Sequence, residues 1–130
     1  MYEIFCKTRF SSAHYLRNYP GNCEKLHGHN WDVKVVIRGE RLDDLGMLID
    51  FRELKAVLKE VIDDLDHINL NEHKGFTDQN PSSELIARYI FKALQTRLSY
   101  KKEVYVHSVT VCETPKTGAT YSEPYAAEQQ

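Results

Sequence analysis

The sequence has little cysteine, no long apolar run and no strong excess of charge of either sign. Its three cysteines, Cys6, Cys23 and Cys112, are odd in number and form no Cys-x-x-Cys pair, which argues against a disulfide framework and favours a reducing compartment. No basic segment followed by an apolar stretch opens the chain, so no signal peptide is predicted. No apolar run approaches the roughly 18 residues of a membrane span. We therefore expect a cytoplasmic protein without a membrane partner.

Net charge and chain length exclude further classes of protein. The 17 Lys and Arg residues are balanced by 19 Asp and Glu residues, giving a formal net charge of −2. This balance provides no basic face for nucleic acid. A length of 130 residues, 42% of them hydrophobic, is enough for one core. Because the sequence shows no repeat and no linker-like stretch, we expect residues 1–130 to form a single domain.

Strands are predicted where apolar and polar side chains alternate, because neighbouring side chains of a strand face opposite sides. The pattern covers residues 2–10, 29–38 and 103–113, and Thr120–Tyr125 indicates a last short strand. Apolar residues of 51–65 recur with helical period instead.

Capping residues place the ends of the helices. Asp50 is a suitable N-cap for the first helix, and Asn80 followed by Pro81 is typical of the start of a second helix. The element order β-β-α-α-β-β predicts an α+β fold, with a four-stranded antiparallel sheet and two helices on one face. Because such a layer is thin, we expect the protein to form a homo-oligomer.

Three histidines are candidate metal ligands. His27 and His29 share one face of a strand with Trp31, and His14 follows the inward-facing residues of the preceding strand. Three neutral imidazoles suit a catalytic Zn²⁺ that keeps one position open. The alternative is that two of them are ordinary surface or core histidines.

Cys23 lies four residues before His27 in a polar loop. A thiol near a metal and a lysine can act as a thiolate base or nucleophile, but it can also close the metal site as a fourth ligand. The spacing alone does not decide between these. Cys6 and Cys112 lie in apolar strands and are expected to fill the core.

Two further acidic residues, Asp66 and Glu113, are candidates for catalysis or ligand binding. Asp66 directly precedes His67, which predicts an acid–base pair, or else a histidine that interacts with the dipole at a helix C-terminus. Glu113 ends an apolar strand, where a carboxylate is costly unless it holds a polar ligand or is solvated. His73 and His107 have no evident partner and are expected to be surface or structural residues.

Short motifs occur in a characteristic order along the chain: Phe10-Ser11-Ser12-Ala13-His14, Cys23-x3-His27-Gly28-His29-Asn30, Ile49-Asp50-Phe51, Leu65-Asp66-His67-x-Asn69-Leu70, Pro81-Ser82-Ser83-Glu84 and Glu113-Thr114. Together they cover nearly the whole chain and are far more specific than any one of them. The sequence resembles the family of 6-pyruvoyl-tetrahydropterin and 6-carboxy-tetrahydropterin synthases.

This resemblance implies the tunnelling fold, whose subunits assemble into barrels, commonly a hexamer of two stacked trimers with active sites at the subunit interfaces. It further implies that His14, His27 and His29 hold Zn²⁺.

The resemblance also assigns roles around the metal. Cys23 would accept a proton, and Asp66 with His67 would form an acid–base relay, in which His67 reaches a neighbouring subunit. Glu113 would anchor the pterin ring and join that relay. Ser82 and Ser83, at the start of the second helix, would line the pterin pocket.

The implied reaction converts 7,8-dihydroneopterin triphosphate into 6-carboxy-5,6,7,8-tetrahydropterin, releasing acetaldehyde and triphosphate, on the route to queuosine and other 7-deazapurines. The short spacing between Cys23 and His27 resembles that of the carboxy-forming branch. Glu24 occupies the position at which a folate-branch subgroup carries glutamate, so a product such as 6-hydroxymethyl-7,8-dihydropterin is an alternative, as is 6-pyruvoyl-tetrahydropterin. A zinc hydrolase and a non-catalytic zinc- or pterin-binding protein are alternatives of other classes.

Overall fold

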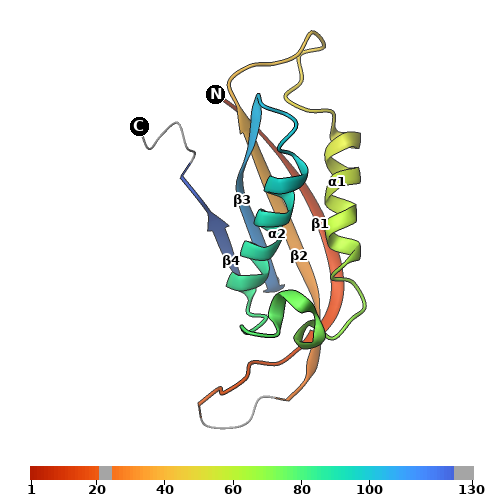
Figure 1. Ribbon diagram of the computed structural model, residues 1–130, viewed down its shortest axis with the longest axis vertical. Helices are drawn as coiled ribbons and strands as arrows, with labels where there is room; N and C mark the ends of the chain where they lie inside the picture. The colour runs from red at the N-terminus through yellow and green to blue at the C-terminus, as the bar shows by residue number, and fades with distance from the viewer. Residues whose placement is uncertain (21–24, 125–130) are drawn as a thin grey trace.

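Two long strands open the chain, and two helices separate them from a second pair of strands (Figure 1). The structure, a computed structural model, describes residues 1–20 and 25–124. The elements follow in the order β1 (Tyr2–His14), β2 (His27–Gly39), α1 (Phe51–Asp63), η1 (Leu70–Glu72), η2 (Lys74–Phe76), α2 (Ser83–Arg97), β3 (Val104–Thr114) and β4 (Thr117–Ser122), where η1 and η2 are short 3-10 helices.

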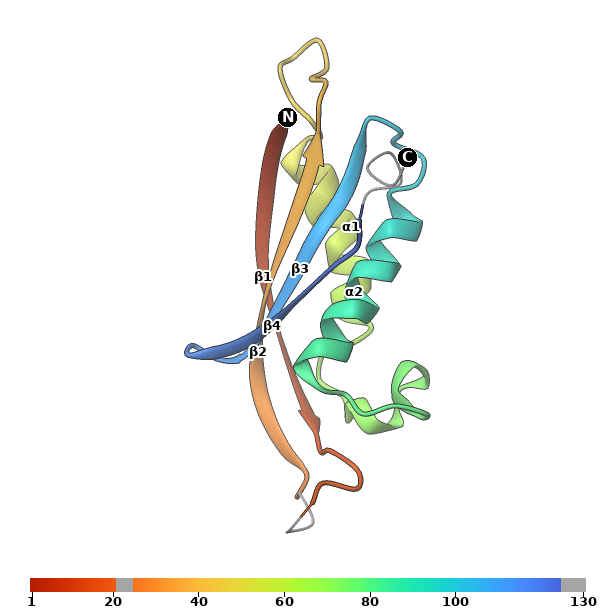
Figure 2. The same ribbon diagram turned by 90° about the vertical axis from the view of Figure 1, so that its left-hand side faces the viewer.

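The four strands form one antiparallel sheet in the order β1-β2-β3-β4. Figure 2 shows α1 and α2 on the same face of this sheet. The opposite face is polar, and it carries ion pairs such as Arg9–Asp32 and Glu3–Arg38 that link β1 to β2. The α+β class and the predicted element order are therefore confirmed.

The core lies between the sheet and the helices. Trp31 and Phe10, both fully buried, stack with their ring centroids 5.9 Å apart on the inner face of β1 and β2. Alternation of side chains puts Val109 and Val111 of β3 on the same inner face. Burial of each such side chain stabilises the fold by about 1.5–3 kcal/mol, so the inner face of the sheet and the helices hold together as one unit.

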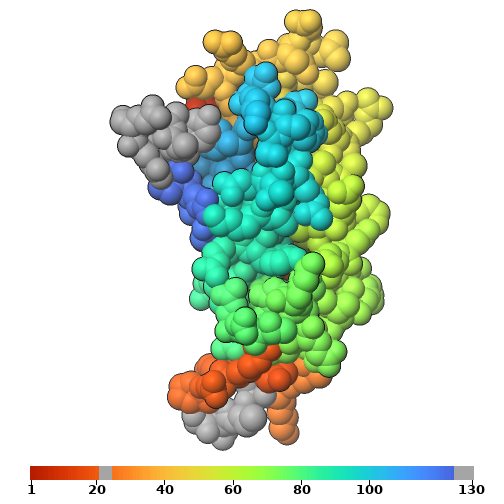
Figure 3. Space-filling model, viewed as in Figure 1, coloured from red at the N-terminus to blue at the C-terminus, as the bar shows by residue number. Residues whose placement is uncertain are grey.

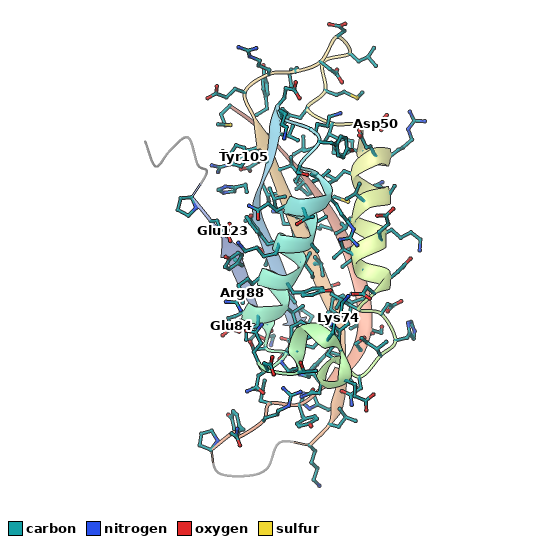
Figure 4. The ribbon with its side chains drawn as sticks, viewed as in Figure 1. Asp50, Lys74, Glu84, Arg88, Tyr105 and Glu123 are labelled. Atoms are coloured by element: carbon teal, nitrogen blue, oxygen red, sulfur yellow. The ribbon has the colours of Figure 1, made fainter. Side chains whose placement is uncertain are left out.

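The two helices run in opposite directions along the sheet (Figure 1). Asp50 caps α1, as predicted, by accepting a hydrogen bond from Arg52 N–H. Figure 4 labels Asp50 at the start of α1 and Glu84 near the start of α2, at opposite ends of the pair of helices. No helix in the described ranges is both long and apolar enough to span a membrane.

The predicted start of α2 is wrong by two residues. The helix begins at Ser83, and the hydroxyl of Ser82 is its cap, accepting from Leu85 N–H at 3.2 Å. Asn80 is not free to cap, because its side-chain amide is hydrogen-bonded to the backbone of Arg17. The carbonyl of the adjacent Pro81 accepts a hydrogen bond from His14.

Strand boundaries and one cysteine also differ from expectation. β1 and β2 extend to Tyr2–His14 and His27–Gly39, and β4 lies at Thr117–Ser122, earlier than predicted. Cys6 is buried, as expected, but Cys112 is only half-buried. Since Cys112 follows the inward-facing Val111, it points to the outer face of the sheet beside Gly118 rather than into the core.

Ser82→Ala removes the oxygen that caps α2 and is expected to lower the free energy of unfolding by about 1 kcal/mol. Ser82→Asp should keep most of the stability, because a carboxylate also caps and suits the positive end of the helix dipole. Urea unfolding followed by circular dichroism measures both variants. Equal stability of Ser82→Ala and the wild-type protein would contradict this assignment of the cap.

Candidate metal centre

Three histidines come together where β1 ends and β2 begins. His14 pairs directly with His27 across the two strands, and His29 follows two residues later on the same face. The ring centroids of His14 and His27 are 4.7 Å apart, and those of His27 and His29 are also 4.7 Å apart. Within the described residues, these three offer ligand atoms that all lie within 4.8 Å of one another. Such a group could hold a metal ion.

Hydrogen bonds to carbonyl groups orient two of the rings. Nδ1 of His14 donates to the carbonyl of Pro81 at 2.8 Å, and Nδ1 of His27 donates to the carbonyl of Lys25 at 2.7 Å. Because a carbonyl only accepts, each Nδ1 carries the proton and each Nε2 keeps its lone pair. In the described ranges, Nε2 of His14 and Nε2 of His29 are buried without a hydrogen-bond partner. A metal ion would satisfy both atoms.

Burial favours the neutral form of His14, which is the form that binds metals. Its side chain is 1% exposed, and this desolvation lowers its pKa, although the Pro81 carbonyl and the Glu113 carboxylate act in the opposite direction. The ring of Trp31 lies beneath the group, 4.7 Å from the His14 ring and 5.1 Å from the His29 ring between centroids. The histidine group therefore lies between carbonyl acceptors and the apolar ring of Trp31.

Glu113, near the end of β3, faces the same group. Its Oε1 lies 3.6 Å from Nε2 of His14, and its Oε2 lies 3.9 Å from Nε2 of His29. The side chain is 33% exposed, so the carboxylate is open on one side. The structure thus brings Glu113 to the three predicted histidines, while its role as an anchor for a pterin stays a prediction.

Asp66 and His67 form a pair at a different place. Asp66 Oδ1 accepts from Ser11 N–H at 2.8 Å, and Asp66 Oδ2 lies 2.9 Å from Nδ1 of His67. The Ser11 amide holds the pKa of Asp66 below its usual range, with His67 adding to that effect. Ser11 precedes His14 by three residues of extended strand, about 10 Å. In a single subunit the pair is therefore separate from the three histidines.

The backbone directs His67 outward. Its φ of 56° is in the left-handed region that residues other than glycine rarely adopt, and its side chain is 79% exposed. Held in this turn, which is hydrogen-bonded to the edge of β1, His67 points to solvent.

The start of α2 borders the histidine group. Ser82 follows Pro81, whose carbonyl orients His14, and Ser83 and Glu84 form the first turn of the helix. Figure 3 shows the segment between α1 and α2 packed against the end of β1, below the helices. A pterin-binding role of Ser82 and Ser83 remains a prediction.

Cys23 and Glu24, the two predicted residues of the loop, lie outside the described residues. The described part resumes at Lys25, whose carbonyl orients His27.

His73 has partners that the sequence did not reveal. Its Nε2 donates to Asp64 at 2.7 Å, and its Nδ1 accepts from Gly75 N–H at 2.9 Å. The hydroxyl of Tyr89 donates to the same Asp64 oxygen, and burial, followed by this hydrogen bond, raises the pKa of Tyr89 to about 12. His73 therefore has a structural role, fastening the segment before α2 to both helices.

Comparison with known proteins agrees with this geometry. The family signature of 6-pyruvoyl tetrahydropterin synthase matches residues 3–124. A 6-carboxy-5,6,7,8-tetrahydropterin synthase of Synechocystis is 36% identical over 129 residues, which are 95% of this chain and 95% of the relative. A protein of the same name from Bacillus subtilis is 32% identical over 92% of this chain and 84% of its own length.

Solved structures show the same fold. The Caenorhabditis elegans 6-pyruvoyl tetrahydropterin synthase superposes with a TM-score of 0.82 at 30% identity, covering 95% of this chain and 96% of its own. A Plasmodium vivax 6-pyruvoyltetrahydropterin synthase, described as a catalytic-residue mutant with cysteine in place of glutamate, has a TM-score of 0.78 at 25% identity and covers 95% of this chain and 98% of its own. The chain belongs to the 6-pyruvoyl tetrahydropterin synthase family.

His29→Ala leaves two imidazoles and is expected to weaken metal binding by more than the 10- to 100-fold that loss of a supporting hydrogen bond costs, because it removes a ligand itself. Metal content after dialysis against zinc, measured by atomic emission, tests this. His107→Ala is the matched control, since His107 is not part of the group. Full metal occupancy in His29→Ala would remove this histidine from the site.

Proposed function

We propose that this member of the 6-pyruvoyl tetrahydropterin synthase family converts 7,8-dihydroneopterin triphosphate into 6-carboxy-5,6,7,8-tetrahydropterin, releasing acetaldehyde and triphosphate. The observation that carries the proposal is the group of His14, His27 and His29 with Glu113 facing it. The names of the Synechocystis and Bacillus subtilis relatives support this product. On this proposal the protein is a cytoplasmic lyase of the queuosine route, and residues 1–130 form one domain.

The three histidines suit zinc in particular. Zn²⁺ takes neutral imidazole nitrogens in a tetrahedral arrangement and keeps one position open when only three protein ligands are present. His14 and His29 each offer a buried Nε2 that has no hydrogen-bond partner among residues 1–20 and 25–124, and burial lowers the pKa of His14. When bound there, Zn²⁺ would supply Lewis-acid polarisation of the side-chain hydroxyl groups of the substrate.

Glu113 would fix the orientation of the pterin. An ionised carboxylate accepts two parallel N–H bonds, and the 2-amino group and ring N–H of a pterin provide such a pair. Because the Glu113 oxygens lie within 4 Å of the histidine nitrogens, the anchor and the metal ligands belong to one site. Ser82 and Ser83, at the adjacent start of α2, would line that pocket.

Proton transfer would involve Cys23 and the Asp66–His67 pair. Cys23, as the thiolate, would remove a proton from the pterin side chain, and the triphosphate would then leave with the electron pair of its C–O bond. Asp66 would hold His67 as the acid–base partner that returns the proton. Cleavage of a carbon–carbon bond in the pterin side chain, with one water consumed overall, would release acetaldehyde.

The separation of Asp66–His67 from the three histidines supports an assembly of several subunits. The pair lies about 10 Å along β1 from His14 and faces solvent. It would therefore complete the site of a neighbouring subunit, in a homo-oligomer that we take to be a hexamer. Neither nucleic acid nor membrane has a part in this proposal.

A second product is favoured by one comparison. In the Plasmodium vivax synthase, the residue that cysteine replaces is a glutamate described as catalytic. This protein has both residue types side by side, Cys23 and Glu24. A carboxylate at this position of the sequence would promote retro-aldol cleavage of the pterin side chain, giving 6-hydroxymethyl-7,8-dihydropterin.

Glu113→Gln is expected to weaken pterin binding about 10- to 100-fold, because charge-assisted hydrogen bonds are worth roughly 1.5–3 kcal/mol. Fluorescence titration with neopterin, an unreactive pterin, measures this, and zinc content should stay unchanged. An unaltered affinity for neopterin would remove Glu113 as the anchor.

Cys23→Ala is expected to lower the rate of 6-carboxy-tetrahydropterin formation by roughly 10²- to 10⁴-fold, as loss of a general base does. Mass spectrometry of the products from 7,8-dihydroneopterin triphosphate measures the rate. Any 6-hydroxymethyl product should persist in Cys23→Ala and disappear in Glu24→Ala.

Zinc-depleted wild-type protein is the control for this experiment and should form neither product. Near-normal carboxy-forming activity of Cys23→Ala would exclude the thiol as base. Release of phosphate with an intact pterin side chain would identify a hydrolase instead.

A further inference from the structure

The hydroxyl group of Ser12 is hydrogen-bonded to both ends of the turn that carries Asp66 and His67. Ser12 is 6% exposed, and its oxygen donates to the carbonyl of Leu65 and accepts from Ile68 N–H at 3.2 Å. Leu65 and Ile68 flank the acid–base pair on its two sides. One buried hydroxyl thus fixes both ends of the segment that presents Asp66 and His67.

This turn needs external support because its backbone is strained. His67 has a φ of 56°, a conformation that is costly for a residue with a Cβ and that persists only where the surroundings hold it. The backbone of Ser11 provides two of the holding contacts, the bond to Asp66 and a bond from His67 N–H to the Ser11 carbonyl at 2.6 Å. Ala13 N–H also donates to the Ile68 carbonyl, at 3.0 Å. The Ser12 hydroxyl differs from these supports because it joins the two ends of the turn to each other through a single oxygen atom.

The same residue is tied to the three histidines. Its carbonyl accepts from the indole N–H of Trp31 at 3.1 Å, and the Trp31 ring supports His14 and His29. Ser12 also precedes His14 by two residues on the same face of β1. A displacement of Ser12 would therefore move the acid–base turn relative to the strand that bears the metal ligands.

We propose that Ser12 is a positioning residue: its hydroxyl holds the Asp66–His67 turn in register with the histidine strand, so that the pair is presented in a geometry competent for proton transfer. This inference rests on the proposed function for its effect on turnover. It assigns Ser12 no contact with the metal or the substrate. Loss of the hydroxyl should therefore lower kcat and leave KM and metal binding nearly unchanged.

The test compares Ser12→Ala with Ser11→Ala in the zinc-loaded protein. Ser12→Ala is expected to lower kcat roughly 10- to 100-fold, as small misplacements of reacting groups do, with KM and zinc content within about twofold of wild type. Amide exchange at Ile68, followed by NMR, should accelerate about five- to tenfold because its acceptor is lost. The hydroxyl of Ser11 bonds to Asn30 on the outer face, so Ser11→Ala should change none of these quantities.

Ser12→Thr keeps the hydroxyl and covers the case in which Ser12→Ala does not fold. It is expected to retain kcat within about threefold and normal exchange at Ile68. A kcat within twofold of wild type for Ser12→Ala would overturn the inference, and so would loss of zinc from that variant or a folded Ser12→Thr with a tenfold loss of kcat. If the wild-type protein turns over no pterin triphosphate, the proposed function fails, and unchanged exchange at Ile68 in Ser12→Ala would then overturn the positioning role itself.

Discussion

The register between β1 and β2, in which His14 pairs with His27, is the constraint on which the site depends. A shift of one residue would turn His14 to the polar face of the sheet and separate it from His29, because side chains alternate. The pairing of Phe10 with Trp31 fixes that register, since a slip would expose two of the largest buried rings in the core. The energy that positions the three histidines therefore comes from hydrophobic packing rather than from contacts among the histidines themselves.

Burial then favours the neutral, metal-binding form of His14. A neutral imidazole costs little to bury when one nitrogen donates to a carbonyl, as His14 does to Pro81, but in the described part of the chain its second nitrogen has no hydrogen-bond partner. A cation would satisfy that nitrogen. Glu113 adds a negative charge beside these nitrogens and further favours a positively charged occupant. The same carboxylate, one-third exposed, stays available to a polar ligand from outside.

The sequence predicted the parts of this arrangement that follow from periodicity. Alternation placed His14, His27, His29 and Glu113 on the inner face without knowledge of the fold. What periodicity could not supply were contacts across long separations. The cap of α2 was misplaced because Asn80 is engaged by the backbone of Arg17, more than sixty residues away. The partners of His73 likewise depend on packing, which local pattern does not encode. The outward position of Cys112, by contrast, follows from the same alternation that places Val111 inward, and the prediction of a core cysteine overlooked it.

The path of the backbone explains why the Asp66–His67 pair lies apart from the three histidines and Glu113. The histidines and Glu113 come from ends of strands on the inner face, whereas Asp66 and His67 lie on a turn that pairs with the outer edge of β1 through Ser11. Edge and face point in different directions, and about 10 Å of extended strand separates Ser11, which holds Asp66, from His14. In the homo-oligomer proposed above, a second subunit would approach at this edge. A turn strained at His67 and held from within by its own strand is suited to meet a partner's site in a fixed geometry, because its shape is set before the partner arrives.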